Sequence, residues 1–134
     1  MDIKQIENLL RLNNIKPSHH RLRIYQYLIE KKNHPTVDIM YRELIKEIPT
    51  LSKTTLYNTL NLFVENKIVH LITIEENETR YDADTSLHGH FKCKDCGEVF
   101  DIRIGITEED FTGLEGFIVE ESDVYFKGLC PKCH

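Results

Sequence analysis

The sequence contains neither a long hydrophobic run nor a leader-like start. No apolar stretch in its 134 residues approaches the roughly 20 that a membrane-spanning helix needs. The start, MDIKQIENLL, carries an acid at position 2 and scattered polar side chains, unlike a secretory signal peptide. With 40% hydrophobic and 29% charged residues, we expect a soluble protein of the cytoplasm without a membrane partner. Thiols stay reduced there, so paired cysteines indicate metal binding more than disulfides.

The sequence also lacks an excess of positive charge, because its formal net charge is -5. Residues 1–81 hold 12 Lys+Arg against 10 Asp+Glu, whereas residues 82–134 hold 5 against 12. The acidity therefore lies in the second part, and the first part can still face a polyanion such as nucleic acid. The contrast predicts two domains, over residues 1–82 and 88–134, joined by a polar hinge over residues 83–87.

Four helices are predicted in the first part, from apolar positions at helical spacing. The first covers IKQIENLLRL, residues 3–12. The other three are expected to begin at side chains that favour helix caps, namely Ser18, Thr36 and Ser52.

The fourth helix, within LSKTTLYNTLNLFVENK, has an unusual outer face. Its apolar residues turn inward and leave small hydrogen-bond donors, an amide and an aromatic ring outside, with no acid before Glu65. An ordinary solvated face usually mixes acids and bases, so this face suits DNA reading, although a solvated face remains the alternative. The candidate DNA contacts on this helix are Lys53, Thr54, Thr55, Tyr57 and Asn58.

A β-hairpin is predicted after these helices, in IVHLITIEENETRYD. The third and fourth helices and this hairpin form a winged helix-turn-helix, which places its second helix in the major groove and its wing against the DNA backbone. Arg80, at the base of the wing, is a candidate contact to a phosphate or a minor groove. The alternative is a surface arginine paired with a glutamate of the same hairpin.

The four cysteines form two matched pairs, Cys93-x-x-Cys96 and Cys130-x-x-Cys133, with 33 residues between them. Each pair can present two thiolates from a tight turn, and together they complete a tetrahedral four-sulfur shell that favours structural zinc. A redox dithiol, an iron site and a haem attachment at CPKCH are the alternatives. Haem attachment normally requires export and would leave the first pair unexplained. Zinc would also stabilise a part of the chain too small for a large core.

Two histidines, His88 and His90, lie just before the first cysteine pair. Alternation along a strand puts both on one face. Asp101 lies on the next predicted strand, and Asp82 precedes the histidines by one short loop. These residues predict a second metal site of nitrogen and oxygen ligands. Ordinary surface or core histidines, the facial triad of a non-haem iron enzyme, and a zinc-ribbon interaction module without DNA binding are the alternatives.

Several motifs together resemble the ferric uptake regulator superfamily of bacterial metal-dependent repressors over essentially the full length. They are SHHR, HPT, LSKTTLYNTL, RYD, HGHFKCKDCGEVFD and CPKC. The resemblance implies an α+β protein with an N-terminal winged helix-turn-helix domain, a small C-terminal α/β dimerisation domain and a regulatory metal at the hinge. It implies no enzymatic activity. The regulatory ligands that the motifs imply are His34, Asp82, His88, His90 and Asp101.

Aspartate at both positions 82 and 101 is most similar to the peroxide-responsive branch of this family, because iron- and zinc-sensing members often carry glutamate. The resemblance then implies a homodimer on a two-fold symmetric operator, with one zinc and one iron(II) or manganese(II) ion per protomer. Peroxide would be sensed by oxidation of ligand histidines. A sensor of iron or manganese level without a peroxide response is the runner-up.

The sequence departs from the family pattern at two places. No histidine occurs between positions 91 and 133, so the additional metal site of some relatives is expected to be absent. The usual threonine-bearing turn before Arg21 is KPSHHR here, which puts family contacts around Ser18 to His20 in doubt. We expect Arg21 and Lys53 to lie near DNA phosphates.

Overall fold

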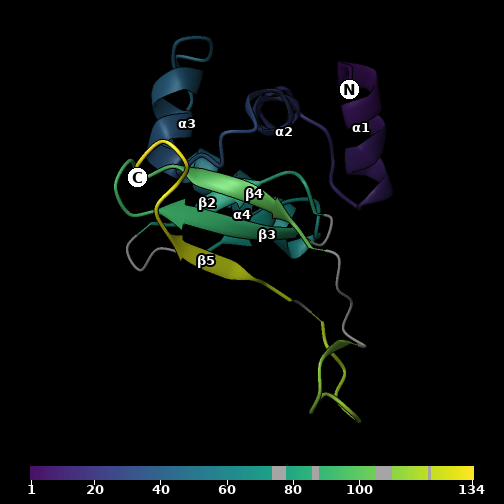
Figure 1. Cartoon of the computed structure of the whole chain (residues 1–134). Helices are drawn as coiled ribbons and strands as arrows, with labels where there is room; N and C mark the ends of the chain where they lie inside the picture. Colours follow the sequence, from purple (N-terminus) through teal and green to yellow (C-terminus); the bar gives the residue numbers. More distant parts are fainter. Residues whose placement is uncertain (74–77, 86–87, 105–109, 121) are drawn as a thin grey trace. The chain divides into compact units, whose positions relative to one another are not determined.

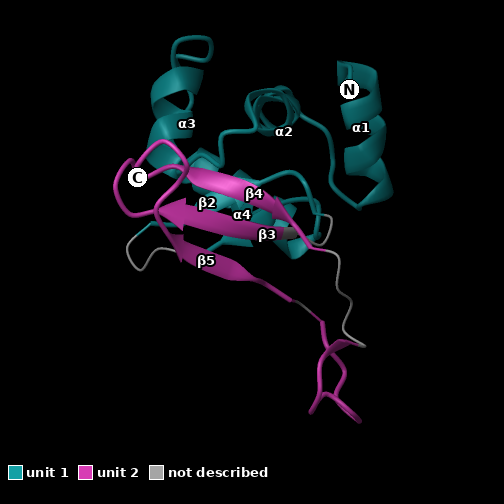
Figure 2. Cartoon of the chain, in the orientation of Figure 1, with its two compact units in different colours: residues 1–85 teal, residues 86–134 magenta. Residues whose placement is uncertain are grey.

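The computed structural model describes residues 1–73, 78–85, 88–104, 110–120 and 122–134 (Figure 1). The chain divides into two compact units, which Figure 2 distinguishes by colour. Unit 1 covers Met1–Thr85 and unit 2 covers Ser86–His134.

Unit 1 begins with the four helices that the sequence predicts, and the helix caps explain where they start. The helices are α1 (Ile3–Leu12), α2 (His19–Lys31), α3 (Val37–Leu44) and α4 (Lys53–Glu65). The predicted caps of the last three are confirmed, because each side-chain oxygen accepts a hydrogen bond from the backbone N–H three residues later. These caps are Ser18, Thr36 and Ser52.

The apolar faces of these helices form one core. From α4, Leu56, Leu60 and Phe63 are completely buried, as the helical spacing predicts. The Phe63 ring meets the Tyr25 ring of α2 edge-on, with 5.5 Å between ring centroids. Truncating such a buried aromatic to alanine typically costs about 3–5 kcal/mol. The core therefore holds α4 firmly and fixes which of its faces points outward.

The wing follows α4 directly. Strands β1 (His70–Ile72) and β2 (Arg80–Asp82) pair antiparallel, with Leu71 opposite Tyr81. The predicted turn of this hairpin falls partly on residues 74–77, which lie outside the described residues. With α3 and α4, the two strands form the expected winged helix-turn-helix.

The described residues of unit 2 form a three-stranded sheet in the order β4-β3-β5. Its strands are β3 (His88–Cys93), β4 (Val99–Arg103) and β5 (Tyr125–Gly128). Strands β3 and β4 pair antiparallel across a tight turn at Gly97, whose φ of 79° suits glycine. Strand β5, which the sequence did not predict, lies parallel to β3. The chain as a whole has the mixed helix and strand class expected from its sequence.

Candidate metal centres and nucleic-acid interface

The four cysteines come together in unit 2 because β3 and β5 are neighbours in the sheet. Cys93 ends β3 opposite Gly128, two residues before Cys130. Each C-x-x-C pair lies on a turn closed by a backbone hydrogen bond, from Gly97 N to Cys93 O at 3.1 Å and from Cys133 N to Cys130 O at 2.9 Å. The four sulfur atoms all lie within 4.8 Å of one another. Sheet pairing and turn geometry thus assemble the cluster that the spacing predicted.

The distances between sulfurs fit a shared metal ion rather than a disulfide. Cys96 Sγ and Cys130 Sγ are 3.9 Å apart, and Cys130 Sγ and Cys133 Sγ are 3.4 Å apart. A disulfide requires about 2.05 Å, whereas four thiolates at 2.3 Å from a tetrahedral zinc lie about 3.8 Å apart. All four cysteines are free thiols. The cluster therefore has the donor set and spacing of a closed four-sulfur metal site.

The backbone around the cluster favours ionised sulfur at one position. The N–H of Cys130 approaches Cys93 Sγ at 3.4 Å. Hydrogen bonds from the backbone of Cys130, and next from that of Cys96, lower the pKa of the Cys93 thiol to about 6. The pKa of Cys133 is raised, chiefly by its hydrogen bond with Cys130. One thiolate beside neighbouring thiols is a suitable starting point for cation binding, since thiolates are the metal ligands.

A histidine–aspartate pair lies in unit 1, where the loop before α3 meets the wing. His34 Nε2 is 3.5 Å from Asp82 Oδ2, and both side chains are largely buried. His34 adopts a left-handed backbone conformation, with φ of 48°. Its carbonyl accepts a hydrogen bond from Arg80 Nη1 at 3.0 Å, and Tyr81 N donates to Pro35 O at 3.1 Å. Strand β2 thus holds the loop so that His34 faces Asp82.

A second histidine–aspartate pair lies in unit 2. His90 and Asp101 are direct partners in the β3–β4 register, and His90 Nε2 is 3.4 Å from Asp101 Oδ1. His88 opens β3 opposite Arg103, but its side chain lies outside the described residues. Imidazole and carboxylate are ligands that first-row divalent ions accept. Four of the five sequence-predicted ligands are therefore paired within the units, His34 with Asp82 and His90 with Asp101.

The outer face of α4 is exposed as the sequence predicts. Lys53, Thr54, Tyr57 and Asn58 are exposed, Tyr57 to 49%, and Thr55 is half-buried. The face thus presents an amide and an aromatic ring that can reach base edges.

Two of the candidate DNA contacts make interactions that the sequence did not predict. Lys53 Nζ lies 2.5 Å from Asp38 Oδ1 of α3, an ion pair that raises the pKa of Lys53 and lowers the pKa of Asp38. Arg80 pairs with Glu78 at 3.7 Å, as the alternative interpretation expected, and it also binds the carbonyl of His34. The Lys53–Asp38 ion pair and the Arg80–His34 hydrogen bond join residues 15 and 46 positions apart, so local sequence patterns do not reveal them.

Thr59 is a polar residue that the sequence analysis passed over. It is 6% exposed and lies among the apolar positions of α4, next to Leu60. Its position among the buried apolar residues of the helix could have identified it as a buried polar residue from the sequence.

The fold and the thiol cluster define a winged-helix protein with a metal-binding strand unit. The chain belongs to the ferric uptake regulator family, whose model matches residues 12–126. Among the described residues, no helix combines the length and apolar character required to cross a bilayer.

Several similar proteins are named for peroxide response. The chain is 29% identical over 135 residues to the peroxide operon regulator of Bacillus subtilis, covering 98% of this chain and 93% of that protein. It is 31% identical over 127 residues to the peroxide-responsive repressor PerR of Staphylococcus aureus strain Mu50, covering 92% and 86%. The crystal structure of the Campylobacter jejuni peroxide stress regulator superposes with a TM-score of 0.73 at 26% identity, covering 99% of this chain and all of that one.

Proposed function

We propose that this protein is a metal-dependent transcriptional repressor of the cytoplasm that releases DNA when peroxide oxidises its ligand histidines. The observation that carries the proposal is the presence of a preformed histidine–aspartate pair in each unit. The names of the similar proteins support the peroxide response.

The four-cysteine cluster is proposed to hold one structural zinc ion per protomer. Zinc suits a closed tetrahedral shell of thiolates and has no redox chemistry of its own. The ion would join two turns of a small sheet and so contribute to its folding.

The regulatory ion is proposed to be iron(II) or manganese(II), one per protomer. Its ligands would be the pair from unit 1 and the pair from unit 2, together with His88. Carboxylate and imidazole ligands suit these ions, although affinity alone would favour copper or zinc. The proposed ligands are His34, Asp82, His88, His90 and Asp101.

The coupling of metal to DNA follows from charge. Bringing the two pairs to one site would oppose the carboxylates of Asp82 and Asp101, which repel each other unless a cation lies between them. A shared ion would fix the angle between the units about the hinge over residues 83–87. In a homodimer that angle sets the spacing of two reading helices, which must match the half-sites of a two-fold symmetric operator.

Exposed apolar side chains of unit 2 support the homodimer. Phe117 is 70% exposed and Ile118 is 92% exposed, and Phe111 and Phe126 are each about half exposed. Large apolar side chains that remain exposed in one copy of the chain can be covered by contact with another protein. A second copy of the chain is the partner that the proposal requires.

The peroxide response is proposed to act on the imidazole ligands. Ferrous iron would supply the electrons that reduce peroxide at the site, and manganese would do so far less readily. The imidazoles of His34 and His88 would be the nearest oxidisable groups. An oxidised imidazole is a poorer ligand, so the units would lose their fixed angle and the dimer its operator.

Substitution of the two aspartates tests the proposal. Asp82→Ala and Asp101→Ala should abolish manganese-activated operator binding while zinc content and dimerisation stay intact. Asp84→Ala is the matched control, because Asp84 is exposed and touches Asp82 Oδ1 through its backbone N–H at 2.9 Å. Normal metal activation in both aspartate variants would contradict the proposal, and steady turnover with iron and oxygen would favour the enzyme alternative.

A further inference from the structure

One row of side chains crosses the sheet of unit 2 at His90. His90 lies on the central strand β3, opposite Asp101 of β4 and opposite Tyr125 of β5. Side chains at paired positions of neighbouring strands lie on the same face of a sheet. Asp101 and Tyr125 therefore flank His90 from its two sides.

Tyr125 contacts His90 through its ring. The two ring centroids are 6.1 Å apart and the ring planes are tilted by 44°, within the range of about 4.5–7 Å that is usual for aromatic contacts. The backbone N–H of His90 donates to the carbonyl of Val124 at 3.0 Å, which holds the two strands together at this position. His90 is only 1% exposed, whereas Tyr125 is half-buried. Tyr125 is thus fixed against a candidate metal ligand and stays accessible to a small solute such as peroxide.

The chemistry of a phenol makes Tyr125 a target for oxidation. Its hydroxyl group donates electron density to the ring, so a phenol is oxidised more readily than an imidazole. Hydrogen peroxide is the oxidant that the proposed function already requires. In the balanced step, the O–O bond of peroxide breaks, and a ring C–H bond beside the hydroxyl becomes C–OH while the other oxygen leaves as water. The ring loses two electrons, and peroxide gains them.

We propose that Tyr125 is a second site of oxidation, which consumes part of the peroxide that reacts at the His90–Asp101 pair and so protects the imidazole of His90. The proposal rests on the proposed function, because it requires a redox-active ion at that pair. It gives a reason why oxidation is expected at His34 or His88 and not at His90, whose ring lies against the phenol. The product at position 125 would be a catechol.

Peptide mass spectrometry separates Tyr125 from every histidine of the chain. Trypsin releases residues 104–127, which contain Tyr125 but no histidine, methionine or cysteine. In the iron-loaded protein, peroxide should add the mass of one oxygen atom to this peptide, and fragment ions should place it on Tyr125 and not on Phe126. In the manganese-loaded protein the peptide should be unmodified. An unmodified peptide in an iron-loaded sample whose histidine peptides carry oxygen would overturn the proposal.

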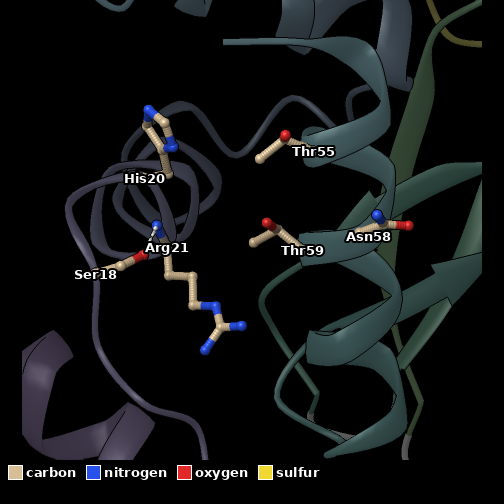
Figure 3. A pocket seen from close by; sticks show the side chains of 6 residues that line it. All are labelled: Ser18, His20, Arg21, Thr55, Asn58 and Thr59. Atoms are coloured by element: carbon tan, nitrogen blue, oxygen red, sulfur yellow. Dashed lines mark hydrogen bonds between the residues drawn. The ribbon is translucent and has the colours of Figure 1, made fainter.

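Two peptides of unit 1 test whether the oxidation is local to the metal. Residues 54–67 contain Tyr57, a phenol that is 49% exposed, and residues 12–21 contain two histidines. One of these, His20, lines a pocket between α2 and α4 and belongs to neither histidine–aspartate pair (Figure 3). Both peptides should stay unmodified. Oxidation of either peptide to the extent seen at Tyr125 would indicate a freely diffusing oxidant and overturn the proposal.

The variant Tyr125→Phe keeps an aromatic ring beside His90 and removes the hydroxyl group. Most of the added oxygen at position 125 should be lost, and oxygen on His90, in the tryptic peptide of residues 81–92, should increase. Tyr41→Phe is the matched control, because Tyr41 is a half-buried tyrosine of α3, and it should change neither. Weaker manganese binding by Tyr125→Phe, with an unchanged oxidation pattern, would show that Tyr125 only packs against His90 and would overturn the proposal.

The oxidation pattern also separates this proposal from peroxide sensing by the histidines. Oxygen on Tyr125 in an iron-loaded protein that stays on its operator, with unmodified histidine peptides, would support oxidation at Tyr125 and contradict the sensor. Oxygen on His34 or His88 with release of DNA, while Tyr125 is unmodified, would support the sensor and overturn the role of Tyr125.

Discussion

Arg80 donates a hydrogen bond of 3.0 Å to the carbonyl oxygen of His34, so the wing is bonded to the loop that carries a candidate metal ligand. The φ of His34 is 48°, a conformation that costs a non-glycine residue about 1–3 kcal/mol and persists only where its surroundings hold it. The Arg80 side chain is 13% exposed. We therefore interpret Arg80 as a residue that positions His34, in preference to the DNA contact predicted from the sequence.

Arg80→Gln should weaken manganese binding about tenfold, because partners that orient metal ligands typically contribute 10- to 100-fold to affinity. At saturating manganese its operator affinity should equal that of the wild type. Calorimetric titration of manganese and an operator titration check both expectations. Arg11→Gln is the control, since Arg11 is an exposed arginine of α1 paired with Glu7. Normal manganese affinity of Arg80→Gln, together with weaker DNA binding at saturating manganese, would indicate that Arg80 contacts DNA and does not position His34.

The ion pair between Lys53 and Asp38 should lower the affinity of the protein for DNA. Asp38→Asn would release Lys53 for a phosphate and remove a nearby negative charge, so affinity for random duplex should rise several-fold. Lys53→Gln should weaken binding to all sequences and reduce the salt slope by about 1. In the Lys53→Gln background, Asp38→Asn should then have little effect, because its partner is gone. An equal gain in both backgrounds would show that Lys53 does not contact DNA.

Cys96→Ser should lose zinc and the folded dimer together, because structural zinc contributes on the order of 10 kcal/mol to folding. Zinc content and sedimentation velocity measure the two losses in one preparation. The same outcome is expected for substitution of any other cysteine in the cluster. A folded, metal-free dimer of such a variant would contradict the proposal that the cysteines hold a structural zinc ion.

Local signals predicted the helices well, and nonlocal contacts explain what was missed. The caps at Ser18, Thr36 and Ser52 depend on hydrogen bonds within three residues, which a sequence displays directly. Strand β5 depends on pairing with β3, which lies more than thirty residues earlier in the chain. Two of its four residues are exposed, and its sequence has no alternating apolar pattern that would predict a strand. The left-handed backbone conformation of His34 could not be predicted from the sequence either.

Among the metal ligands, too, local patterns predicted some residues and nonlocal contacts position the others. The cysteine spacing predicted the thiol cluster, since each pair needs only a tight turn. His34 entered the ligand set through family resemblance, because a histidine in a loop carries no periodicity. Its closeness to Asp82 arises from the hydrogen bonds between β2 and the loop before α3, which no local pattern encodes.

Asn58 is expected to read a base edge from the exposed face of α4. Asn58→Ala should cost roughly 1–3 kcal/mol of operator binding and relax sequence preference at one position in each half-site. Binding to a set of operators with single-base changes measures this preference. Equal weakening on every sequence would mean that Asn58 contacts the DNA backbone.

Peroxide is proposed to act through the metal on a ligand histidine. The most direct measurement is peptide mass spectrometry of the iron-loaded and manganese-loaded proteins after peroxide treatment, with operator binding followed in the same samples. In the iron form, peroxide should add an oxygen to a peptide containing His34 or His88 and release the protein from DNA. The manganese form should be unmodified and stay bound. Oxidation confined to the cysteines, or equal release of DNA from both forms, would rule out peroxide sensing through the ligand histidines and favour a sensor of metal level alone.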